Sequence, residues 1–253
     1  MNTQGSAGRS GRNEQHLEQL ERGLCLYLVR HTDVHNPGDI FYGRLPRFGL
    51  SDLGRQQAER TASVLAEVLV HAFYSSPQLR ARQTARILAS AHGERPLRLS
   101  HLLAEVRTSW QGRPHSELET IRFDFYNNSI HEADETLHQL WDRLNRFVRR
   151  VRSRHRGQAV VAVTHGDIVF LAKSGFRGLP IAIESIRRHG FYPGKGSLVR
   201  LTFGNDLTQT FPISVEYYDP NSDHLEWNQG WVRLEPVSEE ARRTAGQLLD
   251  YTT

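Results

Sequence analysis

The stretch LCLYLVRHTDVH, Leu24–His35, is an apolar run of strand length that ends on an arginine and a histidine. An unbroken apolar run is typical of a strand that is covered on both faces, as in a parallel sheet. A second run of this kind, QAVVAVTHGD at 158–167, also ends on a histidine. Ligands of open α/β sheets lie at the carboxyl ends of the strands. We therefore expect Arg30, His31 and His165 to meet at one edge of a sheet.

Helical patterns alternate with the apolar runs and predict an α/β fold. Residues 49–70 favour a helix with Ser51 as N-cap, and residues 76–93 favour a second helix with Ser76 as N-cap and Gly93 at its end. Residues 132–154 carry one apolar stripe at helical spacing, typical of a core helix. Further strands are expected at 71–76, 97–103, 197–203 and 213–219, the last two able to run antiparallel. The pattern predicts a mainly parallel central sheet with helices on both faces.

The chain divides into a short polar start and one large domain. Residues 1–22 hold no apolar segment and are expected to form a flexible tail with a short helix at 13–21. Residues 23–253 are expected to form a single catalytic domain that ends in a helix at 238–251. Residues from about 105 to 154 begin with an aperiodic segment rich in Trp, Gly and Pro, and predict a helical cap insertion.

Composition excludes several classes of protein. The 253 residues carry a net charge of +4, and 38% of them are hydrophobic. The mean hydropathy is −0.55, and no run reaches the ~18 apolar residues that a membrane helix needs. The basic run RFVRRVRSRHR at 146–156 lacks interleaved aromatic residues, so it favours a solvated helix face over a nucleic-acid platform. A lone Cys25 fits a reducing, cytoplasmic setting, and late strand edges would permit a homodimer.

Five short motifs stand in order along the chain. They are VRHTD, GLSDLGRQQA, YSSPQLRARQTA, LAEVRTSWQG and VTHGD. In this order the chain, from about Leu24 to about Phe203, resembles the histidine phosphatase superfamily, the phosphoglycerate mutase-like enzymes. The resemblance implies a phosphatase that acts on a small phosphorylated metabolite through a phosphohistidine, with no cofactor and no metal.

The resemblance also implies roles for single residues. His31 would be the nucleophile, and covalent catalysis of this kind splits one hard displacement into two easier ones. Arg30, Arg80 and His165 would hold the phosphoryl oxygens. Glu105 would be the general acid and then the general base, with its pKa raised by partial burial. Asp33 is a second acid within the cluster and is the alternative for this role. Gly166 would let the backbone approach the substrate closely.

The loop after the first histidine departs from the family pattern. The family commonly has Gly-Glu after Arg-His, where this chain has Thr32 and Asp33. The residues that would contact the remainder of the substrate are Asn36, Tyr42, Gly43 and Arg44. The reaction is therefore predicted more firmly than the substrate.

Three other interpretations remain open at this stage. A mutase would share the first half of the reaction and return the phosphoryl group to the substrate. A non-catalytic protein could have kept the phosphate pocket. The set His31, Asp33 and His35 could instead ligate a metal ion.

Overall fold

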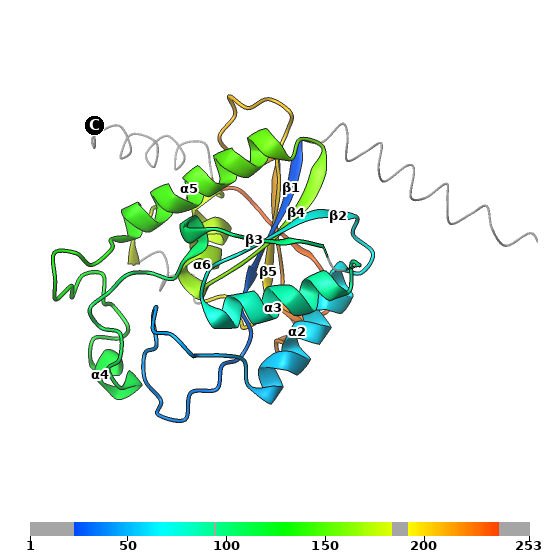
Figure 1. Ribbon diagram of the computed structural model, residues 1–253. Coiled ribbons are helices and arrows are strands. Elements are labelled where there is room, and N and C mark those ends of the chain that lie inside the picture. The colour runs from blue at the N-terminus through cyan, green and yellow to red at the C-terminus, as the bar shows by residue number, and fades with distance from the viewer. Residues whose placement is uncertain (1–22, 94, 184–191, 238–253) are drawn as a thin grey trace, which may run out of the picture.

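The computed structural model describes residues 23–93, 95–183 and 192–237 (Figure 1). The polar start at 1–22, with its expected helix, and the expected terminal helix at 238–251 lie outside these ranges.

A single mixed sheet forms the centre of the described structure. Its seven strands lie in the order β3-β2-β4-β1-β5-β6-β7. The four parallel strands are β1 (Leu24–Arg30), β2 (Val70–Ser75), β3 (Leu97–Leu99) and β4 (Gln158–Thr164). The antiparallel strands are β5 (Leu198–Thr202), β6 (Ser214–Tyr218) and β7 (Val232–Leu234). The predicted mainly parallel sheet with antiparallel late strands is confirmed.

The register of the parallel strands brings their carboxyl ends together. Arg30 at the end of β1 pairs with Thr164 at the end of β4, and the backbone N–H of His31 donates to the carbonyl of Thr164 at 2.9 Å. On the other side of β4, Ser75 at the end of β2 pairs with Val163. The three neighbouring strands β1, β4 and β2 therefore all end at the same edge of the sheet.

Helices cover both faces of the sheet, as predicted (Figure 1). α2 (Asp52–Leu65) and α3 (Leu79–Ser90) share one apolar cluster with β1, β2 and β4. α5 (Leu137–Arg154) and α6 (Gly166–Gly175) share the cluster on the opposite face. Among the described helices, none has the length and apolarity that crossing a lipid bilayer requires.

The predicted apolar stripe of α5 is confirmed as core. Its members are all buried: Leu137, Leu140, Trp141, Leu144, Phe147, Val148 and Val151. Phe147 lies edge-on against Tyr74 of β2, with ring centroids 5.5 Å apart. Thr136 caps the helix through a capping box with Gln139. α5 therefore packs on the sheet, and the irregular part of the expected cap is the segment 105–136, which holds the short α4 (His115–Thr120).

Several predicted element boundaries are wrong. α3 begins at Leu79 with Gln78 as N-cap, because the N–H of Ser76 donates to the carbonyl of Val163 at 2.9 Å and so ties Ser76 to β4. The same helix ends at Ser90, before Gly93. The predicted strand at 97–103 is β3 followed by the 3₁₀ turn η1 (His101–Leu103). The helix predicted over 49–70 is α2, which ends at Leu65; residues 66–69 form the turn that follows, and Val70 is the first residue of β2. The short α8 (Leu225–Asn228) follows β6.

Candidate active site

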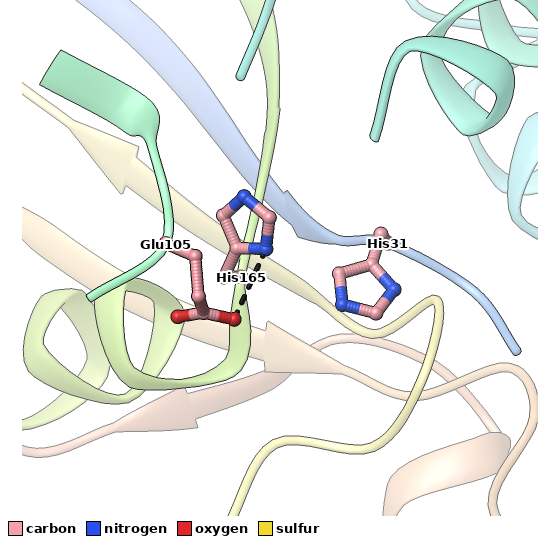
Figure 2. A group of neighbouring side chains, drawn as sticks. All are labelled: His31, Glu105 and His165. Atoms are coloured by element: carbon pink, nitrogen blue, oxygen red, sulfur yellow. Dashed lines mark ion pairs between the residues drawn. The ribbon is translucent and has the colours of Figure 1, made fainter. Parts of the chain in front are cut away.

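Three strand ends deliver the predicted cluster to one place. His31 directly follows β1, His165 is the N-cap of α6 directly after β4, and Arg80 lies in the first turn of α3 after β2. Glu105 joins them from the segment that follows η1, and Figure 2 shows its carboxylate beside the ring of His165. The two histidine rings lie 5.3 Å apart, centroid to centroid. Residues far apart in the sequence therefore form one buried cluster.

The hydrogen bonds of His31 fix its tautomer. Its Nδ1 lies 2.8 Å from the carbonyl of Thr32. A carbonyl oxygen only accepts hydrogen bonds, so Nδ1 carries the proton. Its Nε2 receives the Nε–H of Arg80 at 3.1 Å, so this nitrogen presents its lone pair. Burial lowers the pKa of His31 well below its ordinary value of 6.5, and the charge of Arg80 lowers it further. His31 is therefore neutral near pH 7, with a nucleophilic nitrogen on the side of Arg80.

Arg80 lies at the centre of the cluster and is fully buried. Its N–H groups face the Nε2 of His31 (3.1 Å), the carbonyl of Gly43 (2.8 Å), the Nδ1 of His165 (3.1 Å) and the Oε2 of Glu105 (3.4 Å). The ring of Tyr42 covers its guanidinium at 4.5 Å. Its Nη1 is buried with no hydrogen-bond partner among the described residues.

Arg30 contributes a second guanidinium. Its Nη1 donates to the carbonyl of Pro193 at 2.5 Å, and the ring of Tyr192 lies 4.9 Å from its Cζ. Its Nε is buried and also lacks a partner within the part of the chain that the structure describes. Buried N–H groups are normally satisfied, and the oxygens of a phosphate group are suitable acceptors for two guanidiniums.

His165 is held from both sides of its ring. Its Nε2 faces the hydroxyl of Ser76 at 2.7 Å and the Oε1 of Gln78 at 3.2 Å. Its Nδ1 lies 3.2 Å from the Oε2 of Glu105, the contact that is dashed in Figure 2 and that becomes an ion pair when the ring is protonated. Burial lowers the pKa of His165 to about 4, although Glu105 opposes this shift. Sequence reasoning treated Ser76 as a helix cap and overlooked Gln78, because both residues lie between the end of β2 and the start of α3, where the backbone bond of Ser76 to Val163 holds the chain beside His165.

The charge state of Glu105 differs from the sequence-based expectation. Burial by itself would raise the pKa of Glu105, as expected, but pairing with His165 and Arg80 outweighs burial and lowers it. The predicted raised pKa is therefore wrong for this arrangement of the side chains. The carboxylate is the anionic partner of Arg80 and His165.

Two arginines hold the backbone of Glu105 in place. Arg44, which the sequence predicts to contact the substrate, donates to the carbonyl of Glu105 at 2.7 Å. Arg143 of α5 donates to the same carbonyl at 3.4 Å and to the carbonyl of Ala104 at 2.9 Å. Both guanidiniums also bind Glu135. Sequence reasoning missed Arg143, although an arginine on the buried side of an amphipathic helix is a usable signal.

The remaining loop residues divide into two groups. Asn36 bonds within its own loop, where its Nδ2 donates to the carbonyl of Ile40 at 2.9 Å. Tyr42 and Gly43 lie against Arg80, and the Tyr42 ring centroid is 6.4 Å from that of His31. Gly43 has a φ of +41°, and a Cβ there would lie 2.8 Å from the Cβ of Gln111. The structure thus brings Tyr42 and Gly43 to the cluster and leaves Asn36 outside it.

Asp33 has its carboxylate partners outside the histidine cluster. Its carboxylate pairs with Lys195 and accepts the hydroxyl of Ser51 at 2.6 Å, and these partners lower its pKa against the effect of partial burial. Asp33 therefore stabilises the start of α2, and Glu105 is the acid that faces the histidines.

The metal set considered from the sequence is not assembled. Among the described residues, the group with ligand spacing is His31, Glu105 and His165, whose ligand atoms lie within 4.8 Å of one another. The guanidinium of Arg80 contacts all three side chains. A permanent positive charge in contact with each ligand opposes a metal cation at this place.

Comparisons with known proteins agree with the fold and with the order of motifs. The model of the histidine phosphatase superfamily (branch 1) matches residues 26–210. Phosphoglycerate mutase-like protein 4 of Arabidopsis thaliana is 34% identical over 160 residues, which span 57% of this chain and 67% of that protein. Phosphoserine phosphatase 1 of Hydrogenobacter thermophilus is 30% identical over 148 residues, 55% of this chain and 70% of that protein.

A solved structure shares the fold at lower identity. The mycobacterial glucosyl-3-phosphoglycerate phosphatase Rv2419c superposes with a TM-score of 0.63 at 22% identity, over 86% of this chain and 100% of that chain. The resemblance that the five sequence motifs indicate is thus confirmed by the family match and by the sheet with its edge cluster. This chain belongs to the histidine phosphatase superfamily.

Proposed function

We propose that this protein is a phosphatase that hydrolyses a small phosphomonoester through a phosphohistidine on His31. The observation that carries the proposal is the neutral imidazole of His31, whose Nε2 lone pair lies beside a buried guanidinium with an unsatisfied N–H. The similarity to a phosphoserine phosphatase supports hydrolysis of a small substrate.

In the first half of the reaction, the phosphoryl group moves to His31. Nε2 attacks phosphorus, the bond between phosphorus and the leaving oxygen breaks, and Glu105 gives this oxygen a proton. Arg30, Arg80 and His165 bind the non-bridging oxygens, where preorganised donors stabilise charge during phosphoryl transfer. The Nε–H of Arg80 has to pass from His31 to a phosphate oxygen, and this frees the nucleophile as the substrate binds.

Substrate binding also prepares Glu105 to act as an acid. A phosphate dianion pairs with Arg80, so the guanidinium stabilises the Glu105 carboxylate less. The dianion also repels this carboxylate, and both effects raise the pKa of Glu105. In the second half, Glu105 removes a proton from water, the water oxygen attacks phosphorus, and the bond between phosphorus and Nε2 breaks. Inorganic phosphate leaves, and Glu105 has its proton back for the next cycle.

The test is a panel of phosphorylated metabolites with the purified full-length protein. Release of phosphate that is lost in His31→Ala and kept in His35→Ala is the expected result, because His35 is exposed and lies outside the cluster. Acid-labile phosphate trapped on the protein should disappear in His31→Ala. Interconversion of phosphoglycerates that requires a bisphosphate primer would contradict the proposal in favour of a mutase. Phosphate binding without any turnover would contradict it in favour of a binding protein.

A further inference from the structure

Asp167 holds a buried carboxylate that the proposed reaction does not use. It lies in the first turn of α6, two residues after His165, and is 8% exposed. Both of its oxygens accept tyrosine hydroxyls: Tyr126 donates to Oδ2 at 2.5 Å, and Tyr192 donates to Oδ1 at 2.7 Å. Tyr126 comes from the segment before α5 and Tyr192 from the segment before β5. One carboxylate therefore joins two parts of the chain beside the active site.

Burying the charged form of Asp167 costs free energy. Burial raises the pKa of Asp167 to about 6, and the nearby charge of Glu105 adds to the shift. No cation lies at ion-pair distance from it among the described residues. Burial of a carboxylate without a cation costs free energy, and the two tyrosine hydrogen bonds offset only part of it, since the pKa stays raised.

The Tyr192 side of this arrangement leads to Arg30. The ring of Tyr192 lies 4.9 Å from the Cζ of Arg30, and the carbonyl of the next residue, Pro193, accepts from the Nη1 of Arg30 at 2.5 Å. A cation over an aromatic face and a hydrogen bond from the same segment together fix the guanidinium. The position of Arg30 therefore depends on where Tyr192 and Pro193 lie.

Gly166 makes room for this contact. A Cβ at Gly166 would lie 2.1 Å from the hydroxyl oxygen of Tyr192, so any side chain there would displace the tyrosine. The sequence predicted that Gly166 lets the backbone approach the substrate. In the structure, its missing side chain admits the hydroxyl of Tyr192 to Asp167.

We infer that Asp167 is a positioning residue for the phosphate site, because it fixes Tyr192 and, through Tyr192, the guanidinium of Arg30. The inference rests on the proposed function only in taking Arg30 as a phosphate-binding group. It assigns Asp167 no contact with the substrate.

The deciding measurement is the binding of inorganic phosphate, which needs no turnover, and steady-state kinetics is the second readout. Asp167→Asn keeps the shape but leaves only one acceptor oxygen, and Tyr192→Phe keeps the ring while removing its hydroxyl. Each is expected to weaken phosphate binding about tenfold and to raise KM more than it lowers kcat. Tyr74→Phe is the matched control, since it removes a hydroxyl that bonds His155 at 3.0 Å on another side of the core. This control should keep phosphate affinity.

A double-mutant cycle separates positioning from a merely structural role. In an Arg30→Ala background, Asp167→Asn should cause no further loss of phosphate affinity, because the group that it positions is gone. The inference is overturned if Asp167→Asn and Tyr192→Phe lower the melting temperature but leave phosphate affinity unchanged. It is equally overturned if their effect persists in full without Arg30. Absence of phosphatase activity in the wild type would count against the proposed function, and the binding data would still decide this inference.

Discussion

At the scale of single residues, the protonation of Glu105 controls both halves of the proposed reaction. Glu105→Gln keeps the shape and cannot transfer a proton, so kcat for an alkyl phosphate should fall about a hundredfold or more. An aryl phosphate with an acidic phenol as leaving group needs no protonation in the first step. We therefore expect its burst of phosphohistidine formation to stay close to the wild-type rate, followed by slow hydrolysis. Rapid-quench kinetics measures both steps, and an equal loss of the burst for both substrates would contradict the assignment.

The buried histidines predict how stability depends on pH. The pKa of His165 is about 4 in the folded protein against an ordinary 6.5, so the unfolded chain binds more protons between these values. Stability should therefore fall as pH drops through this window, by up to about 1.4 kcal/mol per pH unit for this group. His165→Asn should remove that share of the slope. Asp167, whose pKa is raised to about 6, opposes the trend, so the comparison with the variant is the informative one.

Urea unfolding at pH values from about 7 to about 5 measures this difference. The exposed His138 offers a matched control, since His138→Asn should leave the slope as it is in the wild type. A wild-type slope that is unchanged in His165→Asn would show that His165 does not titrate as described.

The positions of arginine and histidine at the ends of the apolar runs were enough to predict which side chains form the centre of the site. Arg30, His31 and His165 stand at the ends of two apolar runs, and strand ends of a parallel sheet share an edge. Their partners were harder to predict. Arg44 binds the backbone of Glu105, and Ser76 faces His165, because these contacts depend on turns whose course the sequence pattern does not specify.

At the scale of elements, the start of α2 joins a helix cap to the loop after His31. Ser51 accepts the N–H of Gly54 at 3.0 Å and donates to Asp33 at 2.6 Å. Ser51→Ala removes both bonds and should lower the free energy of unfolding by about 1–2 kcal/mol. Chemical denaturation measures the loss, and Ser63→Ala on the exposed face of the same helix is the control. Equal stabilities of the two variants would refute the role of the cap.

α5 holds the Glu105 segment through Arg143. Arg143→Met leaves the partly buried Glu135 and the carbonyls of Leu102 and Ala104 without this partner, and breaking a buried pair costs up to about 3–5 kcal/mol. We expect this loss of stability together with a lower kcat, because the backbone of Glu105 loses part of its support. The exposed Arg146 on the same helix provides a control, and Arg146→Met should match the wild type in both assays.

The ends of elements were predicted less well than their existence. α3 was placed from its Ser-Pro start, yet it begins later because Ser76 still bonds to β4. A tertiary hydrogen bond decides that boundary, and local propensity does not contain it. The stripe of α5 was predicted in full, since burial against a sheet imposes the helical period directly on the sequence.

At the scale of the whole molecule, the sheet was predictable from alternating strands and helices, and the cap was not. The expected insertion ended at residue 154, but α5 is part of the core and the irregular segment ends at Thr136. The reason is that residues 105–136 enter the core through separate apolar side chains, such as Trp110, Leu118 and Phe125. Scattered polar contacts, such as Arg107 with Glu135 and Ser109 with Asp134, also hold the segment. Contacts of this kind leave no period in the sequence.

The place of β1 in the sheet has a consequence for synthesis of the chain. β1 is the first described strand to leave the ribosome, yet its two neighbours are β4, which begins at Gln158, and β5, which begins at Leu198. At about 5–20 residues per second, this apolar segment waits from several seconds to tens of seconds with both edges unpaired. The nascent chain therefore carries an unpaired apolar strand directly before His31 during this interval, and a chaperone that covers Leu24–Arg30 until translation passes β5 should raise the yield of folded protein.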